Sequence, residues 1–444
     1  MNLTVSPGKA LHGSTRLSGD KSLSHRAALF AALANGESRV ENFLISGVTR
    51  AMLRALTALE VPWSLEGQTL FIQGKGWSAF AAPAEPIHCG NSATTIRLLA
   101  GALAASGVPV VLDGSDGLRR RPMGRIVEPL QAMGVPVTAS EGGGCPLNLA
   151  ARPVRQPLHA LTYALPTASA QVKTCLILAA LAADGPTSLT EPTLSRDHTE
   201  RMLRAMGVEI KTWREADGCA CLTITPPLAP LLPLRLALPG DPSAAAFLIV
   251  AALITPGSEL FLPGVLLNPT RTGLVEALRA MGGQIAISGL HEVNAEPVGD
   301  LTIHASPLQA TAVHGSQVVD MIDEFPAFAI AAAFARGTTR VSEAEELRYK
   351  ESDRITAVVS GLNRLGVTAS ESPDGFSITG TGSVPGGCRV AAQGDHRLGM
   401  SFALAGLAST APITVEDAEI ISESFPDFAG TLRQLGADVA VEER

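Results

Sequence analysis

The chain has 444 residues, of which 46% are hydrophobic, 17% charged and 4% aromatic, and its formal net charge is −8. Since an ordinary domain has roughly 100–200 residues, we expect two or three domains. The apolar content excludes intrinsic disorder, and the negative net charge argues against non-specific nucleic-acid binding, which uses a broad basic surface. The longest apolar run, residues 244–254, is about half of the ~20 residues that span a bilayer, so we predict no membrane segment.

The cysteines and the N-terminus indicate a reduced cytoplasmic protein. The chain has six cysteines, and only Cys219 and Cys221 lie close together in the sequence. One C-x-C pair without a second pair is not a zinc-site pattern, so we predict no metal. The first residues, MNLTVSPGKALHGS, lack the continuous apolar segment of a secretory signal.

A short motif repeats along the chain. The segments LQAMGV, LRAMGV, LRAMGG, LNRLGV and LRQLGA carry glycines at 134, 207, 282, 366 and 436, and a degenerate sixth copy, LTALEV, ends at Val61. Successive glycines are 73, 75, 84 and 70 residues apart. Glycine suits the position just after a helix end, so each motif predicts the end of a helix.

Each repeat has the same internal order. A polar cluster precedes an Ala/Leu-rich stretch that predicts a mostly buried helix. A β-type run follows, such as residues 108–112 or 258–262, and then the amphipathic helix that ends in the motif. Short strands such as 221–225 and 301–305 close the repeat. This order is βαβ-like, and two domains of three repeats suit it better than a solenoid, whose repeats have roughly 20–45 residues. The Pro-rich residues 226–240 are the candidate linker.

The openings of the buried helices predict an anion site. Four of the six expected helices open with Asp, Asn or Ser, and the amides and dipole of a helix N-terminus favour phosphate or carboxylate. Basic residues lie near these openings, namely Lys21, Arg26, Arg119, Arg120, Arg121, Arg125, Lys173, Arg196, Lys350, Arg354 and Arg397. We infer a small substrate with more than one anionic group.

Each group also has a structural interpretation. Lys21 and Arg26 fit the surface of a helix, and Arg119–Arg121 fit a solvated charge run. Residues 350–354 fit helical salt bridging between neighbouring turns, and Asp323-Glu324 fits a helix N-cap. Familiar catalytic motifs such as G-x-S-x-G, H-E-x-x-H and G-x-G-x-x-G are absent from the sequence.

Eight segments in order resemble one enzyme family. They are GDKSLSHRAALFAALANG, CGNSATTIRLLAG, RRRPMGR, ASAQVKTCLILAAL, LSRDHTERML, MIDEFPAFAIAAAFA, EELRYKESDRI and GDHRLGMSFALAGL. From about residue 5 onward the chain resembles the 5-enolpyruvylshikimate-3-phosphate synthases. The resemblance implies an α/β fold of two domains, each with three βαβαββ units around a pseudo-threefold axis, and an active site in the interdomain cleft. It also implies that the first strand joins the second half, which gives domains of residues 19–238 and of residues 1–18 plus 239–444.

The resemblance implies a reaction in the shikimate pathway. Phosphoenolpyruvate and shikimate 3-phosphate would give 5-enolpyruvylshikimate 3-phosphate and phosphate, with no metal and no cofactor. We expect a cytoplasmic monomer whose partners are these two small molecules and neither nucleic acid nor membrane.

The family's shikimate 3-phosphate residues match positions in both halves. They are Lys21, Ser22, Arg26, Ser169, Ala170, Gln171, Arg196, Asp323 and Lys350. Many members have Ser where this chain has Ala170, so a hydroxyl is lost there.

The resemblance also implies a phosphoenolpyruvate site and three catalytic residues. The site residues are Lys21, Asn91, Ala93, Arg121, Gln171, Arg354 and Arg397. Asp323 would accept the proton of the 5-hydroxyl, Glu351 would move a proton at C3, and Lys21 would assist. Many members have a Lys where this chain has Glu423, so one cation is missing there.

Ala93 implies a glyphosate-tolerant class. Many members have Gly at this position, close to the phosphoenolpyruvate pocket. Glyphosate is slightly longer than phosphoenolpyruvate, so the added methyl group should disfavour the inhibitor more than the substrate.

Two other functions stay open. The UDP-N-acetylglucosamine enolpyruvyl transferases share the fold, but their mobile-loop Cys is replaced by Arg within GSDGLRRRPMGR. A non-catalytic small-anion binder of the same fold would need cations, but not the acid–base set of Asp323, Lys350 and Glu351.

Overall fold

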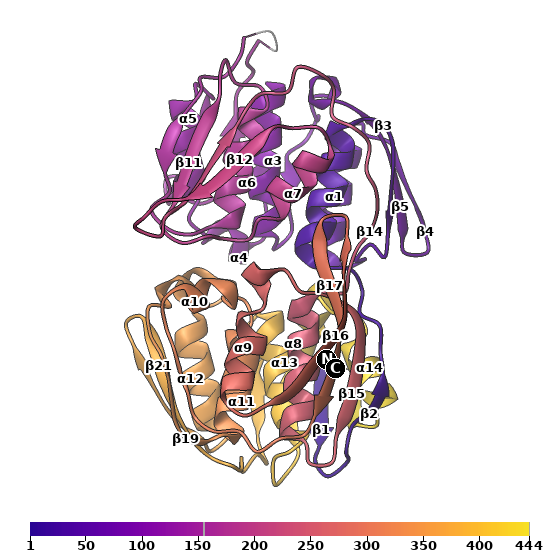
Figure 1. The fold of residues 1–444 in the computed structure, drawn as a ribbon, viewed down its shortest axis with the longest axis vertical. Coiled ribbons are helices and arrows are strands. Elements are labelled where there is room, and N and C mark those ends of the chain that lie inside the picture. The colour runs from indigo at the N-terminus through magenta and orange to yellow at the C-terminus, as the bar shows by residue number, and fades with distance from the viewer. Residues whose placement is uncertain (154–155, 444) are drawn as a thin grey trace. The chain divides into compact units, whose positions relative to one another are not determined.

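The computed structural model describes residues 1–153 and 156–443, and the chain forms two compact units (Figure 1). The N-terminal unit consists of Gly19–Leu238 and the short segment Val293–Glu296. The C-terminal unit consists of Met1–Ser18, Pro239–Glu292 and the chain from Pro297 onward.

Three four-stranded sheets form the N-terminal unit. The first has the order β14 (Arg235–Ala237), β3 (Asn35–Glu41), β5 (Thr69–Lys75) and β4 (Trp63–Glu66). The second has β6 (Ile87–His88), β7 (Val110–Asp113), β9 (Leu147–Leu149) and β8 (Val137–Thr138). The third has β10 (Thr162–Ala164), β11 (Thr187–Glu191), β13 (Ala220–Ile224) and β12 (Ile210–Arg214).

Three more four-stranded sheets form the C-terminal unit. The first has the order β2 (His12–Ser14), β15 (Glu259–Leu266), β17 (Glu296–His304) and β16 (Gln284–Val293). The second has β18 (Ala312–Val313), β19 (Arg336–Val341), β21 (Gly375–Thr381) and β20 (Thr368–Ser372). The third has β22 (Arg389–Ala391), β23 (Ile413–Glu416), β1 (Asn2–Ser6) and β24 (Asp438–Glu442).

All six sheets are built in the same way. A short edge strand runs parallel to its neighbour, and the next pair of strands is antiparallel. The N-terminal strand β1 pairs with β23 and β24, with Leu3 opposite Val415 and Val441. Leu3 and Val5 therefore belong to the hydrophobic core of the C-terminal half, and the indigo start of the chain in Figure 1 lies among late elements. The α/β class is confirmed, and β1 pairs with strands from the end of the chain.

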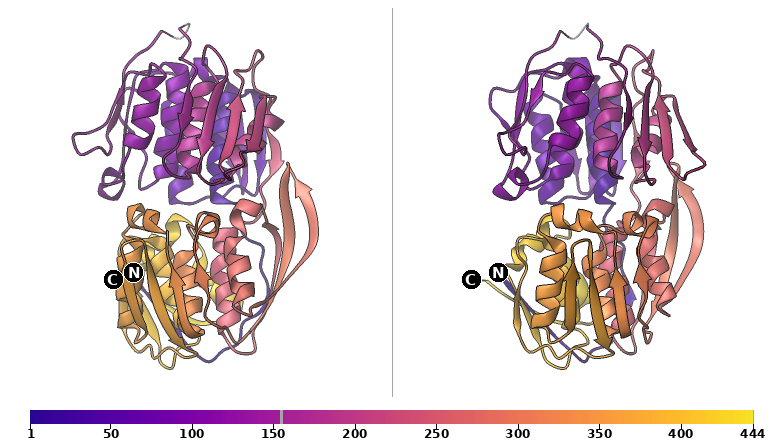
Figure 2. Two further views of the ribbon diagram at one scale, coloured as in Figure 1. Left: turned by 60° about the vertical axis from the view of Figure 1, so that its left-hand side comes forward. Right: turned by 90° about the vertical axis from the view of Figure 1, so that its left-hand side faces the viewer.

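Six buried helices lie on the inner side of these sheets. They are α1 (Lys21–Leu33), α3 (Ala93–Ser106), α6 (Ala170–Ala180), α8 (Pro242–Ile254), α11 (Phe325–Phe334) and α13 (His396–Ala405). Within each unit they run side by side with the strands outside them (Figure 2). The predicted Ala/Leu-rich helices are therefore present, and their apolar surface is buried on nearly every side.

Five of these six helices have a side-chain N-cap, one more than the four that the sequence predicted. In each of the five, an Asp or Ser side chain accepts a hydrogen bond from a first-turn amide; the five residues are Asp20, Ser92, Ser169, Asp241 and Asp395. Glu324 precedes α11 without such a bond. Because each cap occupies one amide, these helix openings offer fewer amides to a ligand than the sequence implied.

The amphipathic helices end where the repeat motif predicts. They are α2 (Gly47–Ala58), α5 (Gly124–Ala132), α7 (His198–Ala205), α9 (Gly273–Ala280), α12 (Arg354–Arg364) and α14 (Phe428–Gln434). The five motif glycines have φ between 85° and 105°, a conformation that glycine adopts without steric cost. In the degenerate copy Glu60 takes this place at φ 59°, so the same turn is kept with a less suitable residue.

Short elements complete the chain. They are α4 (Asp116–Arg119), α10 (Ser316–Asp320), η1 (Trp77–Ala79), η2 (Pro269–Arg271), η3 (Glu345–Tyr349) and η4 (Ala418–Glu423). The linker prediction for 226–240 is partly wrong, because Arg235–Ala237 form β14 and pair with β3. All six cysteines are free thiols. In the described part of the chain, no helix has the length and apolarity that crossing a membrane requires.

Candidate active site

Arg26 lies at the centre of a polar cluster in the N-terminal unit. Its side chain is 2% exposed and donates to Thr199 Oγ1 at 2.8 Å, to Thr174 Oγ1 at 2.9 Å and to the Ser22 carbonyl at 3.1 Å. The interpretation of Arg26 as a helix-surface residue is therefore wrong. Burial lowers the pKa of Arg26 to about 10, so the guanidinium stays charged at neutral pH with uncharged groups as its hydrogen-bond acceptors.

Ser22 connects helix α1 to the segment before α7. Arg196 Nη1 lies 3.5 Å from Ser22 Oγ, so Ser22, Arg26 and Arg196, three predicted shikimate 3-phosphate residues, come together. Lys21 is the first residue of α1, and its carbonyl lies 2.8 Å from His25 Nδ1. Burial, together with the nearby charges of Lys21 and Arg26, lowers the pKa of His25 to about 4. His25 is thus neutral at pH 7.

The start of α6 carries three further predicted residues. Ser169 is its N-cap and Ala170 its first residue. The Gln171 amide accepts a hydrogen bond from Arg97 Nη1 at 2.6 Å and donates one to Thr94 Oγ1 at 3.0 Å. Sequence reasoning missed Arg97, because a single Arg inside an apolar helix matches no motif.

Asn91, Ala93 and Arg121 lie in the second repeat. Asn91 Oδ1 accepts a hydrogen bond from Ser115 Oγ at 3.0 Å, which joins the loop before α3 to the N-cap of α4. Ala93 is the first residue of α3 and is 3% exposed. The run of three arginines is not uniformly solvated: the Arg121 residue is 8% exposed, whereas the half-exposed Arg119 pairs with Asp113.

Lys173 does not face a ligand, contrary to the sequence-based inference. Its side chain is 0% exposed, and its Nζ lies 2.8 Å from both Glu191 Oε2 and Glu200 Oε1. The sequence suggested a ligand-facing cation because Glu191 and Glu200, which pair with Lys173, are distant from it in the sequence.

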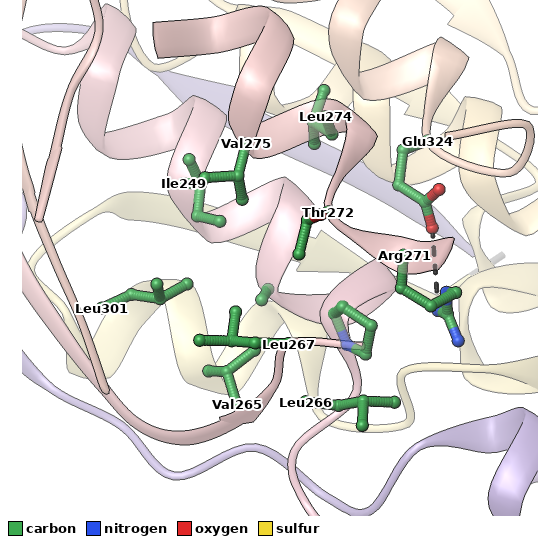
Figure 3. Close-up of a pocket in the computed structure, with 12 residues that line it drawn as sticks. Ile249, Val265, Leu266, Leu267, Arg271, Thr272, Leu274, Val275, Leu301 and Glu324 are labelled. Atoms are coloured by element: carbon green, nitrogen blue, oxygen red, sulfur yellow. Dashed lines mark ion pairs between the residues drawn. The ribbon is translucent and has the colours of Figure 1, made fainter. Parts of the chain in front are cut away.

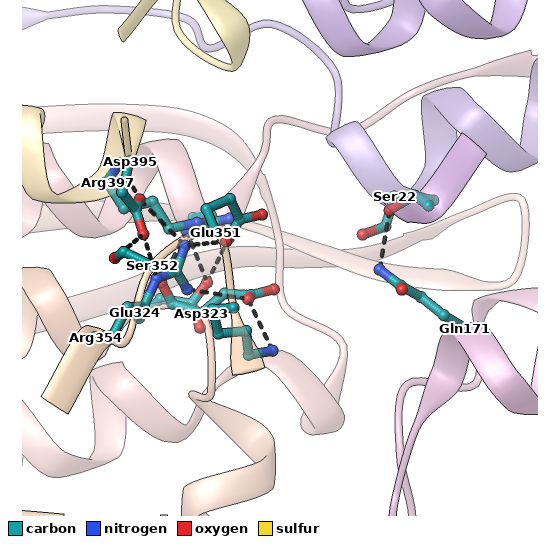
Figure 4. Close-up of polar contacts among 12 residues, drawn as sticks. Ser22, Gln171, Asp323, Glu324, Glu351, Ser352, Arg354, Asp395 and Arg397 are labelled. Carbon is teal, nitrogen blue, oxygen red and sulfur yellow. Dashed lines mark hydrogen bonds and ion pairs between the residues drawn. The ribbon is translucent and has the colours of Figure 1, made fainter. Parts of the chain in front are cut away.

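Arg354 organises a second cluster, in the C-terminal unit (Figure 4). The side chain is 1% exposed and contacts three carboxylates. Its Nε lies 2.8 Å from Asp395 Oδ2, its Nη2 lies 2.7 Å from Glu351 Oε2, and its Nη1 lies 3.5 Å from Asp323 Oδ1. Burial alone would lower the pKa of Arg354, but the carboxylates of Asp395, Glu351 and Asp323 raise it.

Lys350 and Arg397 complete this cluster. Lys350 Nζ lies 3.4 Å from Asp323 Oδ1, and Arg397 Nη1 donates to the Asp323 carbonyl at 3.0 Å. Five sequence-predicted residues of the C-terminal half, Asp323, Lys350, Glu351, Arg354 and Arg397, thus lie in one network. Residues 350–353 precede α12, so the helical interpretation of this segment is wrong, although Glu351 and Arg354 do form a local salt bridge.

Two acids of this network were missed as site residues. Asp395 both caps α13 and pairs with Arg354. Glu324 lies 3.8 Å from Arg397 Nη1, and it accepts a hydrogen bond from Ser243. In the sequence each of these acids stands beside the start of a helix. That position does not reveal an arginine partner from another repeat. Glu423 ends η4 in the same unit.

A pocket beside α8 in the C-terminal unit is a packing feature (Figure 3). Aliphatic side chains such as Ile249, Val265 and Leu274 line most of it. Its charged residues, Arg271 and Glu324, lie 3.9 Å apart and pair with each other. The pocket is therefore unsuited to a polyanion. Among the residues that the structure describes, no group of three or more His, Cys, Asp or Glu side chains could hold a metal ion.

Comparison with known proteins identifies the family. A family model described as EPSP synthase (3-phosphoshikimate 1-carboxyvinyltransferase) matches residues 5–432. The chain belongs to this family. A relative from Parvibaculum lavamentivorans named 3-phosphoshikimate 1-carboxyvinyltransferase is 46% identical over 440 residues, which cover 98% of this chain and 96% of the relative. A relative of the same name from Geobacter sulfurreducens is 45% identical and covers 97% and 98% of the two chains. The chain is therefore an enzyme, a carboxyvinyltransferase.

Solved structures agree with the family and with the fold. An EPSP synthase from Acinetobacter baumannii is 38% identical, with a TM-score of 0.84 over 99% of this chain and 100% of that chain. The enolpyruvyl transferase NikO from Streptomyces tendae is 20% identical with a TM-score of 0.76 over 99% of this chain and 98% of that chain, and this likeness concerns the fold alone. The predicted enolpyruvyl transferase fold is confirmed.

Proposed function

We propose that this protein transfers the enolpyruvyl group of phosphoenolpyruvate to the 5-hydroxyl of shikimate 3-phosphate and releases phosphate. The observation that carries the proposal is the cluster around Arg354, which places the carboxylates of Asp323 and Glu351 beside cations. Carboxylates are suited to moving protons, whereas a protein that only binds anions needs cations.

The N-terminal unit supplies the shikimate 3-phosphate residues in this proposal. Arg26 and Arg196 come together at Ser22, and arginines match phosphate and carboxylate groups with paired hydrogen bonds. Lys21 and Ser22 open α1, and Ser169, Ala170 and Gln171 open α6. A helix opening adds backbone amides and a favourable dipole for an anion.

The C-terminal unit supplies the acid–base groups. Asp323 accepts the proton of the 5-hydroxyl as the oxygen adds to C2 of phosphoenolpyruvate, and Glu351, in its protonated form, gives its proton to C3. The tetrahedral intermediate then loses phosphate from C2, which takes the proton held by Asp323, and Glu351 takes back a proton from C3. Lys350, with its Nζ 3.4 Å from Asp323 Oδ1, holds that carboxylate in place by an ion pair.

Phosphoenolpyruvate is bound in this proposal by Lys21, Asn91, Ala93, Arg121, Gln171, Arg354 and Arg397. Arg354 already contacts three carboxylates, so an incoming anion competes with them for the guanidinium. Exchange at Glu351 releases that carboxylate for proton transfer at C3. The proposed reaction uses residues of both units and uses neither metal nor cofactor. The monomeric state and the cytoplasmic location stay predictions.

Phosphate release tests the proposal. The purified protein is given phosphoenolpyruvate with either shikimate 3-phosphate or UDP-N-acetylglucosamine, and phosphate and the enolpyruvyl product are measured. We expect turnover with shikimate 3-phosphate only. Turnover with the nucleotide sugar would favour the related transferase, and binding without turnover for either acceptor would favour a small-anion binder.

A further inference from the structure

A fully buried group of charges lies beneath the proposed shikimate 3-phosphate residues. Lys173 on α6 pairs with Glu191 at the end of β11 and with Glu200 on α7, at 2.8 Å in each case. The three side chains are 0%, 2% and 1% exposed. The charges of the group are paired with one another, so we assign none of the three residues to direct substrate binding.

Burying such a group is costly, so its presence calls for an explanation. Removing charges from water costs several kcal/mol per ion in proteins, and well-packed apolar residues are often as stable. Burial alone would lower the pKa of Lys173, but the charges of Glu200 and Glu191 raise it, so the ammonium stays charged. A buried ion pair is thus weak evidence for a stabilising role. We therefore ask which neighbouring residues the group holds in place.

The group fixes the backbone of Ser195 from both sides. Lys173 Nζ donates to the Ser195 carbonyl at 3.3 Å. The Ser195 amide donates to Glu191 Oε2 at 3.3 Å, and the Ser195 hydroxyl donates to Glu191 Oε1. Ser195 is itself 3% exposed. Three hydrogen bonds to two buried charged groups therefore hold the residue directly before Arg196.

We propose that Lys173 and Glu191 are positioning residues that set the place of Arg196 and thereby the affinity for shikimate 3-phosphate. The inference rests on the proposed function, because it assumes that Arg196 binds that substrate. The Arg196 guanidinium lies 3.5 Å from Ser22 Oγ. This distance depends on the position of the Arg196 backbone, which follows directly from that of Ser195. Hydrogen bonds to charged groups are about twice as strong as those between neutral groups, so this anchor is a stiff one.

Glu200 provides a matched control within the same group. It lies at the same 2.8 Å from Lys173 Nζ and is equally buried, but the hydrogen bonds of the described residues join Ser195 to Lys173 and Glu191 and not to Glu200. Glu200→Gln therefore disturbs the buried charges while leaving the Ser195 anchor in place.

The experiment is a set of double-mutant cycles with Arg196. Lys173→Met, Glu191→Gln and Glu200→Gln are made alone and together with Arg196→Ala, and the dissociation constant of shikimate 3-phosphate is measured by calorimetry. Residues that act through Arg196 lose their effect once its side chain is gone, whereas independent residues add. Thermal unfolding is recorded for every variant. Ser195→Ala, which removes one bond to Glu191, replaces Lys173→Met if that variant does not fold.

We expect Lys173→Met and Glu191→Gln to raise the dissociation constant about tenfold alone and less than about threefold in the Arg196→Ala background. Glu200→Gln should change it by the same factor in both backgrounds. Equal factors for Lys173→Met and Glu191→Gln in both backgrounds would overturn the inference. An unchanged affinity in Arg196→Ala by itself would instead overturn the proposed role of Arg196, so the two failures are distinguishable.

Discussion

The two units hold their central buried arginines with different partners. Arg26 in the N-terminal unit donates to two threonine hydroxyls and a carbonyl, and burial lowers its pKa to about 10. Arg354 in the C-terminal unit contacts three carboxylates, which raise its pKa above the usual value in spite of burial. Glu191 and Glu200, which belong to the N-terminal unit, are paired with Lys173.

The difference separates two tasks. Around Arg26 the hydrogen-bond acceptors are neutral. The charges of Glu200, Asp20 and Glu296 act on Arg26 as well, and we propose that an anionic ligand adds to them. Around Arg354 the carboxylates of Asp323 and Glu351 neutralise the cations and are available to move protons. We therefore assign shikimate 3-phosphate binding mainly to the N-terminal unit and proton transfer to the C-terminal unit.

The largest expected effect is that of Glu351→Gln. The substitution keeps the size of the side chain and removes its ability to transfer a proton, so kcat should fall about 10²–10⁴-fold. The KM for shikimate 3-phosphate should stay within a small factor of the wild-type value. Steady-state phosphate release gives both constants, and near-normal turnover would remove Glu351 from the mechanism.

The burial of His25 beside two cations should make the protein acid-sensitive. Burial, together with Lys21 and Arg26, lowers the pKa of His25 from 6.5 to about 4. Between pH 6.5 and about pH 4, His25 is therefore protonated in the unfolded state and neutral in the folded state. The free energy of unfolding should fall as pH is lowered through this window, by about 3 kcal/mol for the full shift.

Urea unfolding at pH 7, 5.5 and 4 measures this effect. His25→Gln serves as the control, because it cannot take up a proton and should show a shallower loss between pH 6.5 and 4. The same slope in both proteins would mean that other groups cause the acid sensitivity.

Arg26→Ala should separate binding from chemistry. Charged hydrogen bonds contribute about 1.5–3 kcal/mol each, so the dissociation constant of shikimate 3-phosphate should rise roughly 10–100-fold. With saturating substrate kcat should change much less. Calorimetry and saturation kinetics test this, with Thr174→Val as a milder variant that removes one acceptor of Arg26. A loss of kcat without a loss of affinity would contradict the assignment.

The smallest expected effect concerns Ala93, which is 3% exposed at the start of α3. One methyl group at a tight contact costs roughly 1–3 kcal/mol. In Ala93→Gly, the inhibition constant of glyphosate divided by the KM for phosphoenolpyruvate should fall about tenfold. An unchanged ratio would mean that Ala93 acts only as a helix residue and that the steric argument is wrong.

The sequence predicted the repeated part of the fold well, because the repeats carry local signals. The motif glycines mark helix ends with positive φ, and the polar openings mark helix starts. The exchange of β1 into the C-terminal unit came from the family resemblance alone, since pairing between Leu3 and Val415 has no local signal. The strand β14 was missed because it has three residues within a Pro-rich segment.

Local motifs carry part of the cluster around Arg354. Lys350, Glu351 and Arg354 follow one another in one segment, and the structure adds Asp323 and Arg397 to them. Lys173 shows the limit of this reasoning. Its neighbours in the sequence suggested a ligand-facing cation, but Glu191 and Glu200 bury it. Whether a charge is paired depends on tertiary contacts that no local pattern reveals.

Deuterium incorporation tests the division of tasks most directly. The reaction is run in D₂O with saturating shikimate 3-phosphate, and the deuterium in the methylene group of the enolpyruvyl product is measured by mass spectrometry. We predict that wild-type protein and Arg26→Ala incorporate deuterium at similar rates and that Glu351→Gln incorporates almost none. Incorporation by Glu351→Gln at the wild-type rate, or its loss in Arg26→Ala at saturation, would contradict the account.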